Sequence, residues 1–247
     1  MNHRAGTIVF TALMLALTAL CLWLGTWQMQ RLAEKEALIA AVDSRLDAEP
    51  VPAPSVTEWA SLDTEAMNYQ PVALTGTFRY SQTVTVFTSL ADARGVHGGV
   101  GYWVVTPFVL AEGGTVFVNR GFVPQDFQEA AVTDGGSDEP QVTITGLLRP
   151  AEATSFLTPS PNTSSRIDFV RNPERLAEMV DPALAPFAPF YVDMPAGAPG
   201  ELPQGGETII TFPNNHLGYA VTWYGFAIVA VVMLGFWLWR QRRNGAA

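Results

Sequence analysis

The chain has 247 residues, of which 48% are hydrophobic and 15% are charged, and this composition excludes a disordered or fibrous protein. Its formal net charge is −9, and Lys35 is its single lysine, so the clustered cations that bind nucleic-acid phosphates are missing. Nucleic acid is therefore not an expected partner.

The first element is an apolar segment close to the N-terminus. Residues 5–30 contain no Asp, Glu, Lys or Arg, and this length suffices to cross the hydrocarbon core of a bilayer. A cleaved signal peptide is disfavoured, because the apolar run continues to Leu24, beyond the 7–15 residues of a signal core. Trp23 and Trp27 close the run, as interfacial aromatic residues often do. We therefore expect a transmembrane helix here.

A helical pattern continues beyond this first span. Apolar residues recur at steps of three and four from Gln28 to Leu46, and charged residues such as Arg31 and Glu34 supply a wet face. We interpret the apolar side as a packing face. Three prolines between Ala48 and Ser55 end the helix and predict an extended linker.

From Tyr69 the apolar period changes to two, which predicts a predominantly antiparallel β domain. The expected strands are Val72–Phe78, Thr83–Leu90, Val100–Val109, Thr115–Val123, Val142–Leu148, Phe190–Met194 and Thr208–Thr211. Residues 111–114 predict a hairpin turn, Thr133–Pro140 a loop, and residues 172–179 a short helix. Strand order does not follow from one sequence, so a barrel and an open sheet both remain possible.

The second apolar run is residues 208–239, which again contain no charged side chain. All 23 acidic residues and ten of the 14 basic residues lie between the two runs, giving this middle segment a charge of −13. Arg4, Arg240, Arg242 and Arg243 lie outside the runs. Basic ends remain in the cytoplasm under the positive-inside rule, so we expect the middle segment on the far side of the membrane.

These elements predict a membrane-anchored α+β protein in which two transmembrane helices flank a predominantly antiparallel β extracytoplasmic domain. The expected parts are a cytoplasmic N-terminus (1–5), a first transmembrane helix (6–27), a periplasmic domain (28–212, with a helix at 28–46, a linker at 48–56 and a β-rich part at 69–212), a second transmembrane helix (215–239) and a cytoplasmic tail (240–247).

Residues with catalytic or metal-binding chemistry are few. Cys21 is the single cysteine, so we expect no internal disulfide and interpret it as a small apolar membrane residue. His97 is a candidate general base near Ser89 or Asp92, but a catalytic triad is defined by geometry and not by sequence proximity. The glycine-rich segment around His97 is more simply a turn, and zinc- or calcium-binding patterns are missing. We therefore do not expect an enzyme.

The start of the second span holds the strongest candidate site. Asn214 or Asn215 is a suitable N-cap for the helix. His216, Tyr219 and Trp223 then fall at i, i+3 and i+7 on one face. A neutral imidazole can ligate haem iron and flat rings can pack on a porphyrin, but the same residues are ordinary at a membrane interface. The spacing leaves both interpretations open.

Four sequence blocks occur in order over nearly the whole chain. They are Leu24-Gly25-Thr26-Trp27-Gln28 with Arg31; Tyr69-Gln70-Pro71-Val72 with Gly76 and Phe78; Gly101-Tyr102 through Thr106-Pro107-Phe108 to Val118-Asn119-Arg120-Gly121; and Asn215-His216-Leu217-Gly218-Tyr219-Ala220 with Thr222-Trp223. Together these blocks resemble the Surfeit locus protein 1 family, which includes the yeast Shy protein and bacterial relatives.

The resemblance implies an assembly factor for haem-copper terminal oxidases (cytochrome c oxidase) in a bacterial inner (plasma) membrane. It implies that haem a is bound and that its insertion into subunit I is assisted. Subunit I is the implied partner, and haem a synthase is a second candidate. The alternative is a cofactor-free membrane scaffold that stabilises an oxidase assembly intermediate, in which the histidine at the start of the second span is structural.

The same resemblance assigns roles to individual residues. The ligand implicated in the family maps onto His216, and Trp223 matches an aromatic position of the motif. We expect Tyr219 and Trp223 to flank the haem ring and the first span near Trp27 to complete the cleft. Arg120 is a candidate contact for a propionate or for subunit I, or else a member of a buried ion pair.

Three glycines inside or beside the expected strands have a simpler explanation. We interpret them as backbone requirements at bulges or at sites of close packing. They are Gly76, Gly101 and Gly146.

Overall fold

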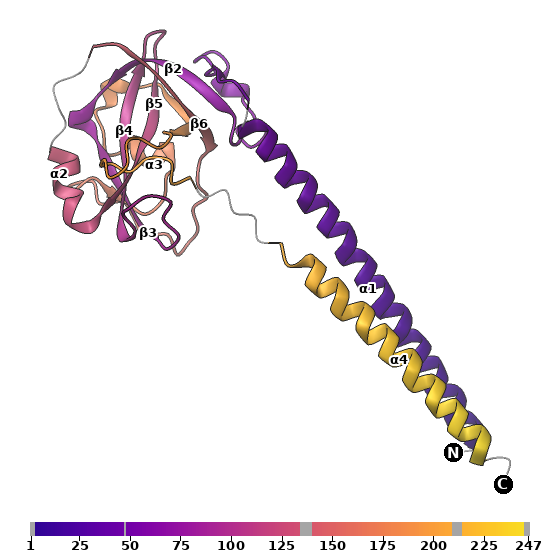
Figure 1. Ribbon diagram of the computed structural model, residues 1–247. Coiled ribbons are helices and arrows are strands. Elements are labelled where there is room, and N and C mark those ends of the chain that lie inside the picture. Colours follow the sequence, from indigo (N-terminus) through magenta and orange to yellow (C-terminus); the bar gives the residue numbers. More distant parts are fainter. Residues whose placement is uncertain (1–2, 47, 134–139, 209–213, 245–247) are drawn as a thin grey trace. The chain divides into compact units, whose positions relative to one another are not determined.

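The computed structural model describes residues 3–46, 48–133, 140–208 and 214–244 (Figure 1). The chain forms two compact units, one made of Met1–Asp43 and Ile210–Ala247 and the other of Ser44–Ile209. The first unit contains helix α4 (His216–Asn244) and all but the last three residues of helix α1 (His3–Leu46). The helices expected at 6–27 and 28–46 are thus one continuous helix, because the helical period passes through Trp27 without a proline.

The two helices lie side by side and run in opposite directions within their unit (Figure 1). Their buried or half-buried residues repeat at alternating steps of three and four, the spacing of a coiled-coil seam. On α1 these are Thr11, Met14, Thr18, Cys21, Gly25 and Gln28, and on α4 they are His216, Ala220, Trp223, Ala227, Ala230, Leu234 and Trp237. Many are small, as in helix pairs whose backbones approach closely inside membranes.

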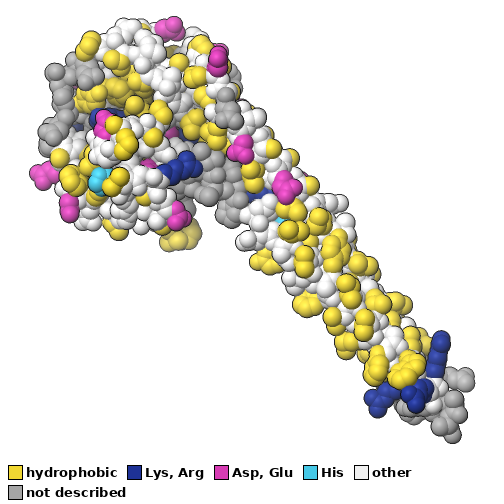
Figure 2. All heavy atoms as spheres, in the orientation of Figure 1, with side chains coloured by type: hydrophobic (Ala, Val, Ile, Leu, Met, Phe, Trp, Pro, Cys, Tyr) yellow, Lys and Arg dark blue, Asp and Glu magenta, His cyan; other side chains and the backbone are white. Residues whose placement is uncertain are grey.

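Both helices are long and apolar enough to cross a membrane. The most apolar 18-residue window is 11% buried in α1 and 17% buried in α4, whereas the core helix of a soluble protein is mostly buried. Figure 2 shows hydrophobic side chains over the visible face of this helical unit and basic side chains at the C-terminal end of α4, where Arg242 and Arg243 lie. These features are consistent with a membrane protein.

The described residues of the second unit form eight strands and several short helices. The strands are β1 (Val51–Pro52), β2 (Pro71–Phe78), β3 (Val84–Leu90), β4 (Gly99–Leu110), β5 (Thr115–Pro124), β6 (Val142–Pro150), β7 (Ile167–Asp168) and β8 (Phe187–Asp193). The helices are α2 (Gln128–Thr133), α3 (Pro173–Ala177) and the 3-10 turns η1 (Trp59–Ser61), η2 (Tyr80–Gln82), η3 (Gln125–Phe127) and η4 (Pro182–Leu184).

Five of the strands close into a barrel. β2 pairs with β6, β6 with β8, β8 with β5, β5 with β4, and β4 returns to β2. β4 is long enough to serve two partners on one edge: its first part pairs with β3 and its last three residues pair with β2. Pro107, which has no N–H to donate, lies where the partner changes. The barrel is antiparallel except for the β5–β8 pair.

Two hydrophobic cores lie on opposite faces of the barrel wall. All five barrel strands contribute to the first, including Val72, Phe108, Val116, Leu148 and Phe190, so this core fills the barrel. The second core lies outside the wall, where side chains of β3, β4, β5 and β8 meet α3. Its members include Val86, Trp103, Phe117, Tyr191 and Leu176. Along β5 and β8, successive side chains alternate between the two cores.

The five strands expected between residues 72 and 148 are confirmed to within two residues. The hairpin turn expected after β4 is also confirmed, and Gly113 and Gly114 in it both have positive φ. The short helix expected at residues 172–179 is confirmed as α3, which the Asn172 side chain caps. The strand expected at Phe190–Met194 is β8, which begins earlier, at Phe187. The expected loop at Thr133–Pro140 and the expected strand at Thr208–Thr211 fall largely outside the described residues.

The interpretation of the three strand-associated glycines is also confirmed. A Cβ atom added at each would lie 2.1 to 2.5 Å from a backbone carbonyl oxygen of a neighbouring strand, closer than real Cβ contacts come. The glycines are Gly76, Gly101 and Gly146. Close approach of strand backbones therefore requires the missing side chain at these positions.

Candidate functional site

The candidate site begins at the first turn of α4. The helix starts at His216, and the carbonyl of Asn215 accepts a hydrogen bond from the backbone N–H of Tyr219 at 3.3 Å. Of the two asparagines expected as N-cap, Asn215 therefore occupies the cap position. The side-chain oxygen of Asn214 is buried and has no hydrogen-bond partner among the described residues.

His216 is half-buried and faces α1. Its Nδ1 lies 2.7 Å from the side-chain oxygen Oε1 of Gln28, which is itself 9% exposed. Because an amide oxygen accepts and does not donate, this contact is a hydrogen bond when Nδ1 carries the proton. In a neutral imidazole the other nitrogen, Nε2, then holds the free lone pair. The contact thus supplies a nitrogen ligand for a metal at the first turn of α4, beside the middle of α1.

The three aromatic residues expected around His216 differ from one another in exposure and in contacts. Trp223 lies one heptad after His216 on the side of α4 that faces α1, and its ring packs edge-on against Phe226 at 6.0 Å between centroids. Tyr219 is 57% exposed, at the flank of this face. Trp27 is also partly exposed, with the guanidinium of Arg31 5.7 Å from the centre of its ring.

Two residues before Gln28 on α1, a second polar contact joins the helices. The hydroxyl of Tyr224 lies 3.3 Å from Oγ1 of Thr26, which donates its own proton to the carbonyl of Leu22 at 2.8 Å. Tyr224 is therefore the donor to Thr26. Its ring lies against α1 because Gly25 has no side chain: a Cβ there would lie 2.7 Å from a ring carbon of Tyr224.

Replacing Gly25 by valine should push α1 and α4 apart, because the added side chain overlaps the Tyr224 ring. We expect the interhelical distance to increase toward the upper end of the roughly 8–10 Å range for packed helices. Electron–electron distance measurements between spin labels on the two helices check this. Gly235→Val is the matched control, since a Cβ at Gly235 meets nothing within 4 Å. An unchanged distance in Gly25→Val would contradict the packing described.

An apolar groove of about 330 Å³ continues along the helix pair beyond Tyr224. It is lined by Thr18 and Leu22 of α1 and by residues of α4 that include Ala227, Ile228 and Val231. The hydroxyl of Thr18 donates to the carbonyl of Met14 at 2.8 Å and does not leave a free polar group in the wall. The groove is therefore suited to hydrocarbon.

The other residues singled out from the sequence lie in the β unit. His97 is in the loop between β3 and β4, and its backbone N–H and C=O both bond the side chain of Gln204. No hydrogen bond among the described residues joins its imidazole to Ser89 or Asp92. The guanidinium of Arg120 lies 4.8 Å from the centre of the Tyr80 ring.

A buried polar network in the β unit centres on Asp193, at the end of β8. Its Oδ1 accepts a hydrogen bond from Asn119 at 2.7 Å, and its Oδ2 accepts one from Thr208 at 2.9 Å. Arg149 and Arg171 each place a guanidinium nitrogen 3.5 Å from this carboxylate. Asp193 thus joins β5, β6, β8, the segment before α3 and residue 208.

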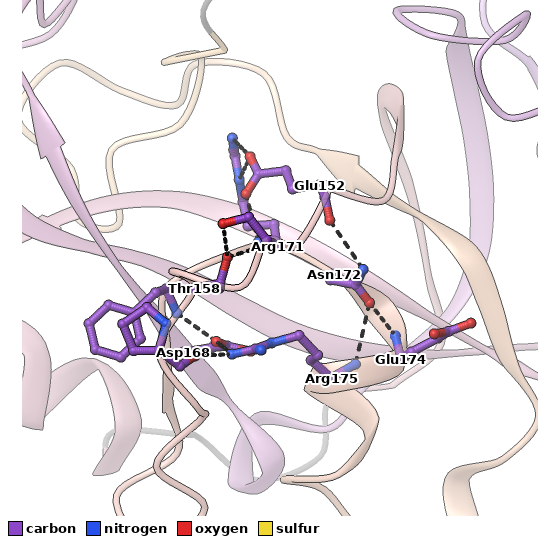
Figure 3. A network of polar contacts seen from close by, with 10 residues as sticks. Glu152, Thr158, Asp168, Arg171, Asn172, Glu174 and Arg175 are labelled. Carbon is purple, nitrogen blue, oxygen red and sulfur yellow. Dashed lines mark hydrogen bonds and ion pairs between the residues drawn. The ribbon is translucent and has the colours of Figure 1, made fainter.

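Arg171 carries the network on to the segment that precedes α3. Figure 3 shows it beside Glu152, whose Oε1 accepts from Nε of Arg171 at 2.9 Å. Burial favours the neutral form of Arg171, but the charges of Asp193 and Glu152 raise the pKa of the guanidinium above its ordinary value. Burial has the opposite effect on Tyr191: it raises the pKa of the hydroxyl, which has no hydrogen-bond partner among the described residues. The two arginines, Arg149 and Arg171, are balanced by the carboxylates of Asp193 and Glu152, and this network stabilises the fold.

A second ion pair anchors α3. Nε of Arg175 lies 3.0 Å from Oδ2 of the fully buried Asp168, and this hydrogen bond raises the pKa of Arg175 (Figure 3). Asn172 accepts from the backbone N–H groups of Glu174 and Arg175, which caps the helix. The long segment between β6 and β8 is therefore held by charged and capping side chains.

Gln28 belongs to the first of the four sequence blocks but was not among the residues predicted for the site. Its position in the sequence nevertheless indicates a role. Gln28 is a large polar residue on the packing stripe of α1, one turn after Gly25 and within the uncharged segment 5–30. Polar side chains in such stripes usually have a partner on the facing helix.

Comparison with known proteins gives one family. Residues 15–228 match the family profile described as "SURF1 family". A "SURF1-like protein" from Monosiga brevicollis is 35% identical over 261 aligned residues, covering 99% of this chain and 91% of the relative. Relatives described as "Surfeit locus protein 1" are 34% identical in Homo sapiens, over 83% of this chain and 69% of the relative, and 34% identical in Gallus gallus, over 86% and 69%.

Proposed function

The chain belongs to the SURF1 family, and on this premise we propose that it is an assembly factor for a haem-copper terminal oxidase. In this proposal it binds haem a through His216 and assists its insertion into subunit I of cytochrome c oxidase. Subunit I is the proposed partner, with haem a synthase as the second. The protein acts as a carrier and not as an enzyme.

The observation that carries this proposal is the hydrogen bond between Nδ1 of His216 and Oε1 of Gln28 at 2.7 Å. A neutral imidazole whose Nδ1 is the donor offers Nε2 to a metal, as haem-binding histidines do. The donor therefore fits a haem iron. When bound, haem a supplies the redox-active iron porphyrin that the oxidase requires.

The surroundings of His216 support an apolar, flat ligand. Trp223 offers an aromatic ring on the side of α4 that faces α1, Tyr219 and Trp27 offer partly exposed rings, and the apolar groove beyond Tyr224 offers space for a hydrocarbon substituent. A single histidine ligand also suits hand-over, because fewer bonds must break before release than in a site with two protein ligands.

We place the protein in the inner (plasma) membrane of a bacterium, with the lipid bilayer around α1 and α4. The apolar side chains exposed along both helices support the bilayer as their surroundings. Arg4, Arg240, Arg242 and Arg243 support an orientation with both termini in the cytoplasm. The acidic β unit then lies in the periplasm, and the first turn of α4 lies toward the outer leaflet.

The alternative is a cofactor-free membrane scaffold that stabilises an oxidase assembly intermediate. In that case the contact between His216 and Gln28 holds the helices together and serves no metal. The contact between Tyr224 and Thr26 supports this alternative, since it joins the helices without offering a ligand for a metal.

Purification from a strain that makes haem a separates the two functions. We expect the full-length protein to retain a haem whose extracted pigment is haem a, at close to one per chain. Protein that is folded and free of haem, isolated from cells that make haem a, would support the scaffold and overturn the carrier.

A further inference from the structure

Gln28 and His216 form a polar contact between α1 and α4. Gln28 is 9% exposed, His216 is half-buried, and both lie on the stripe through which α1 and α4 pack. Gly25, one turn before Gln28, lets the two helices approach closely. The amide of Gln28 is thereby held at hydrogen-bonding distance from the imidazole.

The identity of the acceptor decides which ring nitrogen is protonated. A neutral imidazole exists as two tautomers, with the proton on Nδ1 or on Nε2. The atom of Gln28 at 2.7 Å from Nδ1 is a carbonyl oxygen, which accepts and does not donate. The bond therefore stabilises the tautomer with the proton on Nδ1 and the lone pair on Nε2, and it also fixes the orientation of the ring.

The partner is an amide and not a carboxylate. A carboxylate that accepts a hydrogen bond from the ring nitrogen not bound to the metal makes the histidine more basic and strengthens its bond to the metal. A neutral amide in the same place also orients the ring, but it increases the basicity of the histidine less. This combination suits a ligand that must bind iron in a defined geometry and later release it.

We propose that Gln28 is the positioning residue of the haem site: it selects the tautomer of His216 that presents Nε2 to the iron, and as a neutral acceptor it keeps the bond to iron weak enough for transfer. This inference rests on the proposed haem-binding function. Gln28 itself does not contact the iron in this arrangement.

The first test reads the tautomer in full-length, haem-free protein. The chain has three histidines, so a His3→Gln/His97→Gln background leaves His216 as the single source of a ¹⁵N-histidine NMR signal when the protein carries no histidine tag. In the neutral imidazole we expect Nδ1 to be protonated and Nε2 to be unprotonated. Gln28→Leu, which lacks the acceptor, should shift the proton toward Nε2.

Two further variants make this test specific. Gln30→Leu is the matched control, because Gln30 is an exposed glutamine on the same helix, and it should leave the tautomer unchanged. Gln28→Glu keeps an acceptor oxygen and should keep the proton on Nδ1. An unchanged tautomer in a folded Gln28→Leu protein would overturn the role of Gln28.

The second test uses the haem-loaded protein. We expect Gln28→Leu to release haem at least about tenfold faster than the parent, as outer-sphere variants of metal sites often do. Gln28→Glu should slow release and lower the haem reduction potential, whereas Gln30→Leu should change neither quantity. Equal release rates and potentials in all four proteins would overturn the inference. A parent protein that takes up no haem would instead overturn the proposed function, so the two failures are distinguishable.

Discussion

Replacing His216 by alanine should lower the amount of haem retained by the purified protein by at least about tenfold. The loss follows because the variant removes the nitrogen donor on the face of α4 that meets α1, and a tenfold change corresponds to only about 1.4 kcal/mol. The measurement is the haem-to-protein ratio after purification from a strain that makes haem a, together with the absorbance spectrum.

Two controls separate ligand loss from misfolding. His97→Ala changes a histidine in the β unit and should leave the ratio unchanged. Adding imidazole to the His216→Ala protein should restore part of the haem spectrum, because the free ligand occupies the space that the side chain has left. A His216→Ala protein with the haem ratio and spectrum of the parent would contradict the ligand assignment.

Replacing Asp193 by alanine should destabilise the β unit by about 3–5 kcal/mol, the range for breaking a buried charge network by removing one partner. Arg149 would lose its carboxylate partner and Arg171 would keep only Glu152. The side chains of Asn119 and Thr208 would lose an acceptor. Buried cations without a counter-charge are costly because protein interiors solvate charge poorly.

Thermal unfolding of the full-length protein, followed by tryptophan fluorescence, measures this effect. For a protein of this size, 3–5 kcal/mol corresponds to a fall in Tm of roughly 6 °C or more. Asp193→Asn keeps one acceptor oxygen and should fall between the parent and Asp193→Ala. Asp126→Ala, which changes an exposed carboxylate, is the control and should leave the Tm unchanged. If Asp193→Ala unfolds at the parental Tm, the network does not stabilise the fold.

Local patterns predicted the elements of the β unit well. The strand Pro71–Phe78 alternates because Val72 and Leu74 fill the barrel while Thr75, on the other face, is exposed. This alternation is a period-two signal that a single sequence displays. The turn glycines Gly113 and Gly114 were equally visible, because their positive φ reflects a local requirement.

The barrel itself was not predictable in the same way. Its closure depends on β2 reaching the far end of β4, and its parallel β5–β8 pair depends on a segment that returns after more than sixty residues. Such pairings depend on long-range packing, which produces no periodic pattern in the sequence. The two-residue strands β1 and β7 are too short to display any period.

The helical site was predictable from the sequence on one side only. The spacing of His216 and Trp223 on α4 was readable, since residues seven apart share a helix face. The partner on α1 required knowledge of which residue faces His216 across the pair. That choice depends on the relative rotation of two helices, and the structure resolves it in favour of Gln28.

The most direct test of the central claim is to identify the atom bound to the haem iron. The His3→Gln/His97→Gln protein, labelled with ¹⁵N-histidine and loaded with haem a, retains His216 as its one labelled residue. Pulsed electron paramagnetic resonance of the oxidised protein should then detect a ¹⁵N hyperfine coupling from one directly coordinated imidazole nitrogen. A protein that binds haem a stoichiometrically but lacks this ¹⁵N coupling would contradict the assignment of His216 as the iron ligand.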